Sequence, residues 1–477
     1  MLWAADGDTF TANTVEGVEM TFKVISEADK TCQVGKGGTL ERSVARNTKG
    51  IITIPNQANE YTVTTIGKYA FNNCSGLTSV TIPEGVTSIG DQAFSACKGL
   101  TSITIPSSVT SIGVSALSGC IGLTTVTIPS SVTSIGGYAF SDCTGLASVT
   151  IPSSVTEIGI QAFSNCIGLE SIIVSEGNAV YDSRNNCNAI IKTASNTLTH
   201  GCKDTIIPSS VTCIGDCAFF GCTGLISITI PSSVTSIGVS AFSGCTGLTS
   251  VTIPEGVTNI GSSAFSGCTS ITSITIPSSV VKIDEQAFLN CTGLTTVTIP
   301  EGVTNIGSGA FWKCTGLASV TIPSSVTSIG NFVFRDCTGL ESITIPSSVN
   351  SIGLSVFNGC TGLASVTSLI QEPYEIKGNV FSVYKTATLY VPKGTKAKYE
   401  ATPTWNQFEK MEEFEASEQP KGDVNGGMTI DVADIASVIN VMASAPDHPL
   451  RQAADVNKDG VVDVADIATI INEMASK

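Results

Sequence analysis

Charged side chains are scarce in this chain of 477 residues: only 13% of its residues are Asp, Glu, Lys or Arg. The 40 acids outnumber the 24 bases, which gives a net charge of −16, and such a chain is not attracted to nucleic acids or anionic membranes. Histidine is almost absent, with only His200 and His448. No phosphate-binding loop occurs, and no serine or cysteine has a suitable base beside it in the sequence. The sequence therefore predicts a protein that is not an enzyme and has no nucleic-acid partner.

Long apolar runs are missing as well. No stretch approaches 18 consecutive apolar residues, so no membrane span is expected. The first residues, Met1-Leu-Trp-Ala-Ala, precede an acidic, polar stretch, as the end of a signal peptide and its cleavage site would. We expect an exported protein, secreted or at a cell surface, whose signal peptide is absent from this chain or truncated. The alternative is a short disordered N-terminus.

A 23-residue repeat dominates what is present. The dipeptide Ile-Pro returns at that period in two series. Its prolines are Pro83, Pro106, Pro129 and Pro152, then Pro208, Pro231, Pro254, Pro277, Pro300, Pro323 and Pro346. A repeat of this length cannot bury its apolar face alone, so the copies are expected to stack into a solenoid that shares one long core.

One unit, Leu100–Gly122, illustrates the predicted coil. Leu100–Ile105 alternates in the manner of a β-strand, and Pro106 ends the strand because proline has no N–H to donate. Gly113 then turns the chain. Ala116, Leu117 and Cys120 have the spacing of a helical turn that faces inward. The prediction is a coil of strand, turn and helix.

These repeats resemble the leucine-rich repeats of bacterial BspA-like surface proteins, whose pattern is Leu-xx-Ile/Val-Thr-Ile-Pro-xx-Val-xx-Ile-Gly-xx-Ala-Phe-xx-Cys. The match covers roughly residues 50 to 410. The resemblance implies an α/β solenoid, a right-handed leucine-rich repeat with a parallel sheet. It also implies a location outside a bacterial cell and a role as a surface adhesin for host matrix proteins or other bacteria.

Most of the 17 cysteines recur at the repeat period: Cys74, Cys97, Cys120, Cys143, Cys166, Cys222, Cys245, Cys268, Cys291, Cys314, Cys337 and Cys360. Cysteines in register on successive coils keep their Cβ atoms about 5 Å apart, whereas a disulfide needs about 3.8 Å. We therefore expect buried thiols that pack as small hydrophobic side chains.

An insertion separates the two series of repeats, because Pro152 and Pro208 are one coil plus 33 residues apart. Cys187 and Cys202 flank segments that predict a hairpin turning near Ala194-Ser195, where they are either disulfide-bonded or free thiols. Cys213 and Cys217 have no histidine near them, so no metal is expected there.

Two rows of hydroxyl side chains are expected on the outer face of the sheet, among them Ser79, Thr81, Ser102, Thr104, Thr125, Thr127, Ser148, Thr150, Ser227, Thr229, Ser250, Thr252, Ser273 and Thr275, ending at Ser365 and Thr367. They stabilise a pleated surface, or they form an uncharged surface for an extended polymer such as a glycan or a matrix protein. Irregular residues are further candidates: Trp312, Lys313, Phe332, Arg335 and Asp336, and the insertion near Tyr181 to His200.

The predicted domain order follows from these patterns. An N-terminal β cap covers residues 1–65, the repeat solenoid 66–364 with a hairpin insertion at about 175–205, and a C-terminal capping repeat 365–414. Within the last, Tyr399, Trp405 and Phe408 are expected to cover the final coil. Residues 415–421 form a linker, and 422–477 a separate C-terminal module.

Two acidic loops in this module repeat at a distance of 32 residues, and each leads into an apolar helical stretch. Their spacing matches the calcium loop of EF-hands, which supplies oxygen ligands from positions 1, 3, 5, 7, 9 and 12. The second loop offers Asp455, Asn457, Asp459, the carbonyl of Val461, Asp463 and Asp466. The first offers Asp423, Asn425, the carbonyl of Thr429, Asp431 and Asp434. Because Gly427 lacks a side-chain oxygen and Met428 replaces the turn glycine, the first loop should bind Ca²⁺ more weakly.

Paired loop–helix units of this kind resemble a dockerin type I module, a small all-α calcium-binding fold. The resemblance implies a cohesin-type partner, contacted at positions 10 and 11 of each loop, here Val432, Ala433, Val464 and Ala465. From Glu409 onward the chain has 14 acidic and 5 basic residues, a net of −9, and bound cations would offset part of that repulsion.

The sequence thus predicts an exported, non-catalytic binding protein with an adhesive leucine-rich repeat surface, held by a calcium-dependent dockerin–cohesin contact. The alternative is a structural spacer in a polysaccharide-degrading cohesin–dockerin assembly, with no ligand of its own.

Overall fold

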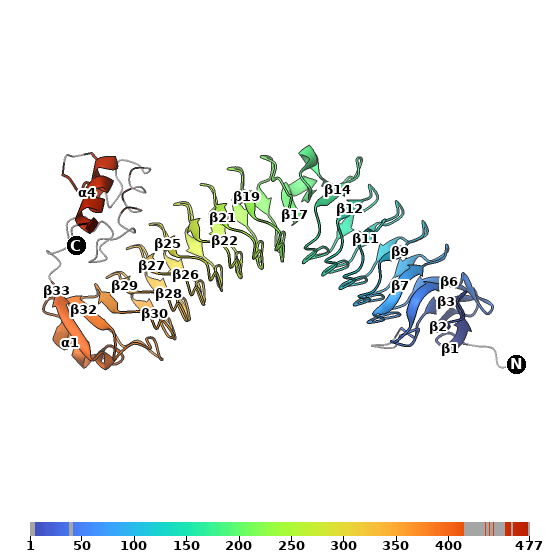
Figure 1. The fold of residues 1–477 in the computed structure, drawn as a ribbon, viewed down its shortest axis with the longest axis horizontal. Coiled ribbons are helices and arrows are strands. Elements are labelled where there is room, and N and C mark those ends of the chain that lie inside the picture. The colour runs from blue at the N-terminus through green and yellow to red at the C-terminus, as the bar shows by residue number, and fades with distance from the viewer. Residues whose placement is uncertain are drawn as a thin grey trace. The chain divides into compact units, whose positions relative to one another are not determined.

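The computed structural model describes residues 5–37 and 42–414 and, in the C-terminal part, residues 435, 438, 442, 454–458 and 461–475. It divides into two compact units, Met1–Leu248 and Thr249–Lys477. Figure 1 traces the chain. Among the described residues no helix is both long and apolar enough to cross a membrane.

The first unit begins with an antiparallel arrangement of three strands, β1 (Thr9–Asn13), β2 (Glu19–Ser26) and β3 (Thr31–Val34). β3 continues in parallel to β6 (Tyr61–Ile66), against which β5 (Gln57–Ala58) also pairs. Met20 and Phe22 on β2 are fully buried. The strands therefore cover the start of the repeat core.

Most coils contribute one strand to a first parallel face, here called the first sheet although it falls into separate ladders, and a two-residue strand to a second. The coil of Thr125 has only an isolated bridge to Ser148 on the first. The first set is β4 (Lys49–Thr53), β7 (Gly76–Thr81), β9 (Ser102–Thr104), β12 (Ser148–Ile151), β14 (Ser171–Val174) and β19 (Ser227–Thr229). The second is β8 (Ser88–Ile89), β10 (Ser111–Ile112), β11 (Ser134–Ile135), β13 (Glu157–Ile158), β18 (Cys213–Ile214) and β20 (Ser236–Ile237). Ser111 pairs with Ser88 on one side and Ser134 on the other. The predicted parallel solenoid of 23-residue coils is confirmed.

The insertion adds a hairpin to the second sheet. β16 (Ala189–Lys192) pairs antiparallel with β17 (Thr197–Gly201) and with β15 (Tyr181–Asp182). The hairpin turns through a 3₁₀ segment, η2 (Thr193–Ser195), and another, η1 (Arg184–Asn186), precedes β16. β17 then pairs in parallel with β18, which returns the chain to the regular coil.

The second unit repeats the pattern. Its first sheet has β21 (Ser250–Thr252), β23 (Ser273–Thr275), β25 (Thr296–Thr298) and β27 (Ser319–Thr321), followed by β29 (Ser342–Ile345), β31 (Ser365–Ser368), β32 (Thr388–Pro392) and β33 (Lys410–Phe414). Its second has β22 (Asn259–Ile260), β24 (Lys282–Ile283), β26 (Asn305–Ile306), β28 (Ser328–Ile329) and β30 (Ser351–Ile352). The unit also has a short helix α1 (Lys396–Ala401), a 3₁₀ segment η3 (Trp405–Gln407) and a C-terminal helix α4 (Val464–Ala475).

The helical turn predicted in each coil is replaced by a ladder of turns. The N–H groups of Gln92, Phe94 and Ala96 donate to carbonyls of the next coil at 2.7–2.9 Å, while the residues between them bond three residues back. Gln92 and Ala96 have φ angles of 53° and 58°, in the left-handed region that interrupts an α-helix. Within the described coils the inward-facing spacing therefore comes from strands and turns, without an α-helix.

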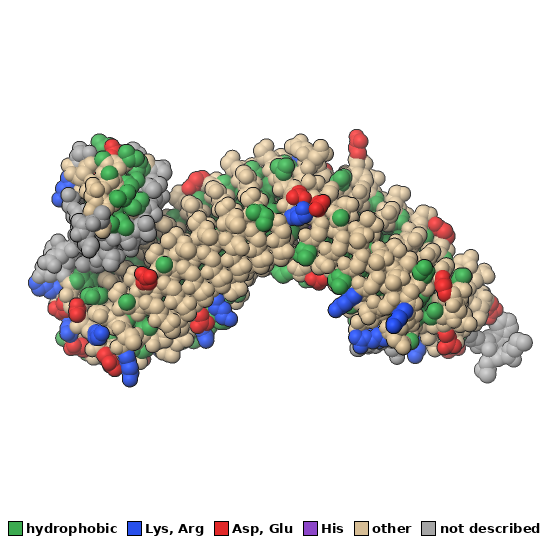
Figure 2. Space-filling view, in the orientation of Figure 1, with side chains coloured by type: hydrophobic (Ala, Val, Ile, Leu, Met, Phe, Trp, Pro, Cys, Tyr) green, Lys and Arg blue, Asp and Glu red, His purple; other side chains and the backbone are tan. Residues whose placement is uncertain are grey.

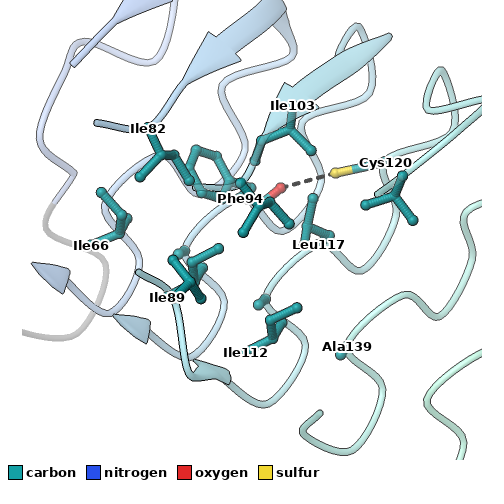
Figure 3. Close-up of a cluster of buried hydrophobic side chains, with 14 of the residues drawn as sticks. Ile66, Ile82, Ile89, Phe94, Ile103, Ile112, Leu117, Cys120 and Ala139 are labelled. Carbon is teal, nitrogen blue, oxygen red and sulfur yellow. Dashed lines mark hydrogen bonds between the residues drawn. The ribbon is translucent and has the colours of Figure 1, made fainter. Parts of the chain in front are cut away.

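A continuous column of buried side chains fills the coils. Val109, Ile112, Leu117 and Cys120 are all at most 1% exposed, and each such aliphatic side chain contributes about 1.5–3 kcal/mol on burial. Figure 3 shows Ile66, Ile89 and Ile112 following one another from coil to coil. Phenylalanines stack in the same way, for example Phe311 on Phe334 with ring centroids 5.5 Å apart and planes at 7°.

The parallel stacking of the phenylalanine column ends at Phe381. The ring of Phe381 stacks on Phe357 but meets Phe408 edge-on, at 68°. Trp405 and Tyr399 are fully buried and meet at 79°. The indole N–H donates to the carbonyl of Tyr374, and the phenol donates to that of Ile370. Because Phe408 lies edge-on against Phe381, no further ring stacks in parallel on it, and the column of parallel rings ends here.

Candidate calcium loop and binding surfaces

The second acidic loop leads directly into α4. Asp463 precedes the helix, and its Oδ1 accepts the backbone N–H of Ala465 at 2.7 Å, which is the bond that an N-cap makes. Asp466 lies in the first turn. Its carboxylate accepts the backbone N–H of Asn457 at 3.1 Å and that of Asp463 at 2.9 Å. One carboxylate thus ties the beginning of the loop to the beginning of the helix.

The burial of this carboxylate fits a hard cation. Asp466 is 0% exposed, in a segment whose described core is Val438, Ala454, Val456, Val462 and Ile470. A buried, ionised carboxylate is costly unless it is paired, and among the described residues its oxygens meet only backbone N–H groups. Each oxygen retains acceptor capacity. The residues present therefore suit Ca²⁺, whose ligands are such oxygens.

Only part of the predicted ligand set can be placed. Asp455, Asn457, Val461, Asp463 and Asp466 are described, and Asp459 is not. Within the described residues no three His, Cys, Asp or Glu side chains gather as a metal-binding group. The whole first loop, from Asp423 through Asn425, Thr429 and Asp431 to Asp434, lies outside the described residues.

The predicted contact positions of the second loop open α4. Val464, its first residue, is 70% exposed, and Ala465 is exposed beside it. An apolar side chain this exposed is available to a partner surface. Their counterparts Val432 and Ala433 lie outside the described residues.

The hydroxyl rows lie on the first sheet as predicted from the alternation. Ser102 and Thr104 are exposed on either side of buried Ile103, and the Oγ of Ser102 bonds that of Ser79 at 2.9 Å. The view in Figure 2 shows coils dominated by uncharged polar groups and backbone, with isolated charges. The described strands of the first sheet thus expose mainly hydroxyl groups.

One part of this face departs from the pattern. A hollow of about 430 Å³ is lined by residues of three successive coils: Thr125, Val126, Thr127, Ile128, Ser130, Ser148, Thr150, Pro152 and Ser175. Beyond it, isoleucine takes the place of the outward threonine: Ile173, paired with Thr150, is 50% exposed, and Ile206 is 72% exposed. These two residues were not predicted, because the insertion between them interrupts the repeat period.

The irregular aromatic and charged residues form a cluster in the second unit. Trp312 and Phe332 lie with ring centroids 5.9 Å apart, and the guanidinium of Arg335 lies over both rings. Lys313 lies over Trp312 as well, and Asp336 accepts the indole N–H. The structure thus brings together five residues that the sequence placed in two consecutive coils.

All 17 cysteines are free thiols, and those at the repeat positions are buried except for Cys222, which is partly exposed. Cys187 and Cys202 in the insertion are buried and unbridged, so the free-thiol alternative holds there. Asn188 lies opposite Cys202 at the end of the hairpin, because Ala189 pairs with Gly201. Cys213 and Cys217 are partly exposed and belong to no metal-binding group of described residues.

Comparisons with known proteins agree with this architecture. The model of the BspA type leucine-rich repeat region matches residues 64–190, 191–316 and 281–400, and that of the dockerin type I domain matches residues 421–475. No curated protein matches.

Solved structures of bacterial proteins match this chain, among them two leucine-rich repeat proteins. One from Bacteroides ovatus is 30% identical, with a TM-score of 0.49, and the match covers 80% of this chain and 100% of that one. One from Eubacterium ventriosum is 24% identical, with a TM-score of 0.55, covering 74% and 95%. The pneumococcal vaccine antigen PcpA is 20% identical, with a TM-score of 0.55, covering 86% and 100%.

Proposed function

Because the chain belongs to the BspA-type leucine-rich repeat family and ends in a dockerin type I domain, we propose that it is an exported, non-catalytic binding protein of a bacterium. Its repeats present an adhesive surface to a host matrix protein, a bacterial surface or a glycan. Its C-terminal domain attaches it, through Ca²⁺, to a cohesin-type module.

The buried carboxylate of Asp466 carries the calcium part of the proposal. Ca²⁺ would be held by the side chains of Asp455, Asn457, Asp459, Asp463 and Asp466 and by the carbonyl of Val461. When bound, the ion supplies the positive charge that the buried acid lacks and joins the loop to α4. Dockerin type I domains bind calcium as a family. A second, weaker ion in the first loop is part of the proposal.

The exposed start of α4 supports the partner contact. Val464 and Ala465 follow the ligand Asp463 directly, so ordering the loop would also fix these two apolar side chains. A partner that covers them would remove the 70% exposed Val464 from water. Cation binding and partner binding are therefore coupled through one turn of helix.

The features of the repeats support a non-catalytic binding role. Leucine-rich repeats and dockerins are non-catalytic families. His200 is buried and meets the ring of Phe163 edge-on at 5.9 Å, so it is not available to a substrate as a base. The open hydroxyl face offers many weak, repeated contacts, which suit an extended polymer.

Capture of the full chain on immobilised type I cohesin modules tests the proposal. Retention in millimolar Ca²⁺ and release by a chelator are expected, because calcium loops have Kd values between the nanomolar and millimolar ranges. The variant Asp455→Ala with Asp466→Ala should lose both calcium uptake and capture. Glu375→Ala with Glu400→Ala, which removes two exposed acids elsewhere in the same unit, should keep both.

Binding of the full chain to matrix proteins, cells and polysaccharides tests the repeats. Binding that survives chelation supports the adhesive surface. Calcium-dependent cohesin capture with no ligand for the repeats would leave them as a spacer and contradict the adhesive part of the proposal.

A further inference from the structure

We propose that Trp312, Lys313, Phe332, Arg335 and Asp336, called here the Trp312 cluster, form a docking site for an acidic segment of a partner protein. This inference rests on the binding role proposed for the repeats and gives it a location and a ligand chemistry. The cluster lies entirely within the second unit, on the turn segments of consecutive coils.

Two rings and a guanidinium form the centre of the cluster. The indole of Trp312 and the ring of Phe332 are tilted by 32° with centroids 5.9 Å apart. The Cζ atom of Arg335 lies 5.5 Å from each centroid. Stacked on two rings, the guanidinium loses little further rotational freedom when it binds a ligand.

The indole is fixed by its own hydrogen bond. Its Nε1 donates to Oδ2 of Asp336 at 3.1 Å. The same carboxylate oxygen lies 3.7 Å from Nε of Arg335, which is too far for a hydrogen bond. That Nε is buried and has no hydrogen-bond partner among the described residues. Asp336 therefore orients Trp312 by a hydrogen bond and forms an ion pair with Arg335 that lacks a hydrogen bond.

The charge of the cluster is opposite to that of the chain. Lys313 adds a second cation, 5.7 Å from the indole centroid, so two cations face one carboxylate. The chain as a whole carries −16. Because two cations and one carboxylate leave the cluster a net charge of +1 while the chain as a whole is acidic, an acidic partner would be directed here.

The side chains of the cluster differ from those of neighbouring coils. Phe332 has a φ angle of 60°, as the equivalent residues of other coils also do, for example Gly309 at 64° and Ser355 at 53°. Where Phe332 stands, these two adjacent coils therefore have only a small residue. In the row of Trp312 and Arg335, earlier coils of the unit have Ser266 and Leu289. The turns form without aromatic rings at these positions, so the rings of the cluster are available for a contact outside the fold.

An acidic peptide fits the cluster better than a sugar ring. The faces of Trp312 and Phe332 already carry cations, so a pyranose would have to displace one of them to stack. A carboxylate instead pairs with the exposed part of the guanidinium and leaves the stack intact. Tryptophan and arginine are also the residues that most often dominate the energy of protein–protein contacts.

Titration of the full chain with a synthetic dodecapeptide of glutamates and two phenylalanines tests the inference. Indole fluorescence and calorimetry are followed in low salt with a chelator present. We expect saturable binding that salt weakens. Arg335→Gln and Trp312→Ala should each raise Kd about tenfold, with Arg335→Lys in between because it keeps charge without the fork. Lys385→Gln, which removes an 83% exposed cation of the same unit, should leave Kd unchanged, and thermal melts confirm that each variant folds.

The peptide with glutamine in place of glutamate should not bind. Equal Kd values for Arg335→Gln and the unchanged chain would overturn the inference. Tighter binding of polygalacturonate that is lost in Arg335→Gln would overturn it too, because the partner would then be an acidic polysaccharide. If the peptide does not bind while calcium-dependent cohesin capture is intact, the docking site is contradicted and the proposed attachment to cohesin stands. If capture is lost while the peptide still binds, the attachment to cohesin is contradicted and the docking site stands.

Discussion

The thiol of Cys314 donates a hydrogen bond to the backbone carbonyl oxygen of Phe288 in the preceding coil, 3.2 Å away. The same bond links neighbouring coils elsewhere, at Cys97–Phe71, Cys120–Phe94, Cys143–Leu117, Cys166–Phe140, Cys245–Phe219, Cys291–Phe265, Cys337–Phe311 and Cys360–Phe334. A cysteine at this position fills the core and also supplies a donor to a carbonyl inside it, which alanine or valine could not do.

Alkaline conditions should therefore unfold the repeats. Burial raises the pKa of Cys97 to about 12 and that of Cys120 well above its ordinary value of 9. In the unfolded chain these thiols ionise near the ordinary value, so above about pH 9 the unfolded state binds fewer protons and stability falls as pH rises. Each thiol that ionises only on unfolding lowers the free energy of unfolding by about 1.4 kcal/mol per pH unit in this range. Thermal melts of the reduced protein from pH 8 to 11 measure this fall.

The variant Cys120→Ala should show a smaller loss of stability per pH unit, although it is less stable at pH 7. A melting temperature that stays constant from pH 8 to 11 would contradict the assignment. Thiol labelling of the native protein at pH 8 gives an independent check, because the partly exposed Cys213 and Cys217 should react before the buried cysteines.

Removal of one ring from the phenylalanine column should be costly. Phe311 is fully buried and stacks on both Phe288 and Phe334, so Phe311→Ala should lower the free energy of unfolding by about 3–5 kcal/mol. Phe311→Leu should cost less, since Leu117 occupies the same position in its own coil. Urea denaturation followed by circular dichroism measures both, and Tyr138→Ala, at a residue 42% exposed, is the surface control. A cost for Phe311→Ala no larger than for the control would refute the packing argument.

Acid should act on the insertion through His200. Burial lowers the pKa of His200 to about 4 from 6.5, its Nε2 is without a hydrogen-bond partner in the described structure, and Thr199 contacts Nδ1 at 3.2 Å. As pH falls, the imidazole is protonated in the unfolded state before it is protonated in the folded state. The contribution of neutral His200 to the free energy of unfolding is therefore complete above about pH 6.5, and about 3 kcal/mol of it is lost as pH falls toward 4. Melts of the protein and of His200→Leu between pH 7 and 4 should diverge, with the leucine variant less sensitive to acid. Parallel curves would show that His200 is not the group responsible.

Calcium should stabilise the C-terminal segment. An ion that binds only the folded loop adds about 2.7 kcal/mol at 100 times its Kd. Chelation should lower the melting temperature of this segment and reduce its helicity, whereas Asp466→Asn, which keeps the shape but not the charge, should remove most of the calcium response. Calorimetry in calcium and in chelator measures the shift; an identical trace in both would argue against a metal-stabilised loop.

The repeat pattern predicts much of this fold, because a strict period forces equivalent residues into register. It predicts that Ser111 follows Ser88 and that Cys120 is buried. The inward spacing of Ala116, Leu117 and Cys120 is the same in a helix and in a run of turns, so spacing alone could not separate the two. What decides is the left-handed backbone at non-glycine positions such as Gln92 and Ala96, which composition does not reveal.

The candidate sites were predictable to different degrees. The calcium loop is defined by local spacing, so Asp463 and Asp466 stand out in the sequence. The Trp312 cluster was visible as a list of unusual residues, but the stacking of Arg335 on two rings depends on the separation of adjacent coils. Ile173 and Ile206 were hidden because the insertion between them disrupts the period.

The turn ladder has a consequence for how such chains change in length. Within the regular coils of each unit, the N–H groups of the ladder find their acceptors 22 residues further on, as Phe94 does at Ala116, so what one regular coil requires of the next is the same. Loss or duplication of one whole coil would leave each remaining N–H donor opposite an equivalent carbonyl acceptor. Insertion or deletion of a single residue would instead move the donors of that coil out of register with their acceptors. Genes for such chains can therefore gain or lose repeats by recombination between near-identical stretches without a cost in hydrogen bonds, and the number of coils can vary among relatives while each coil is preserved.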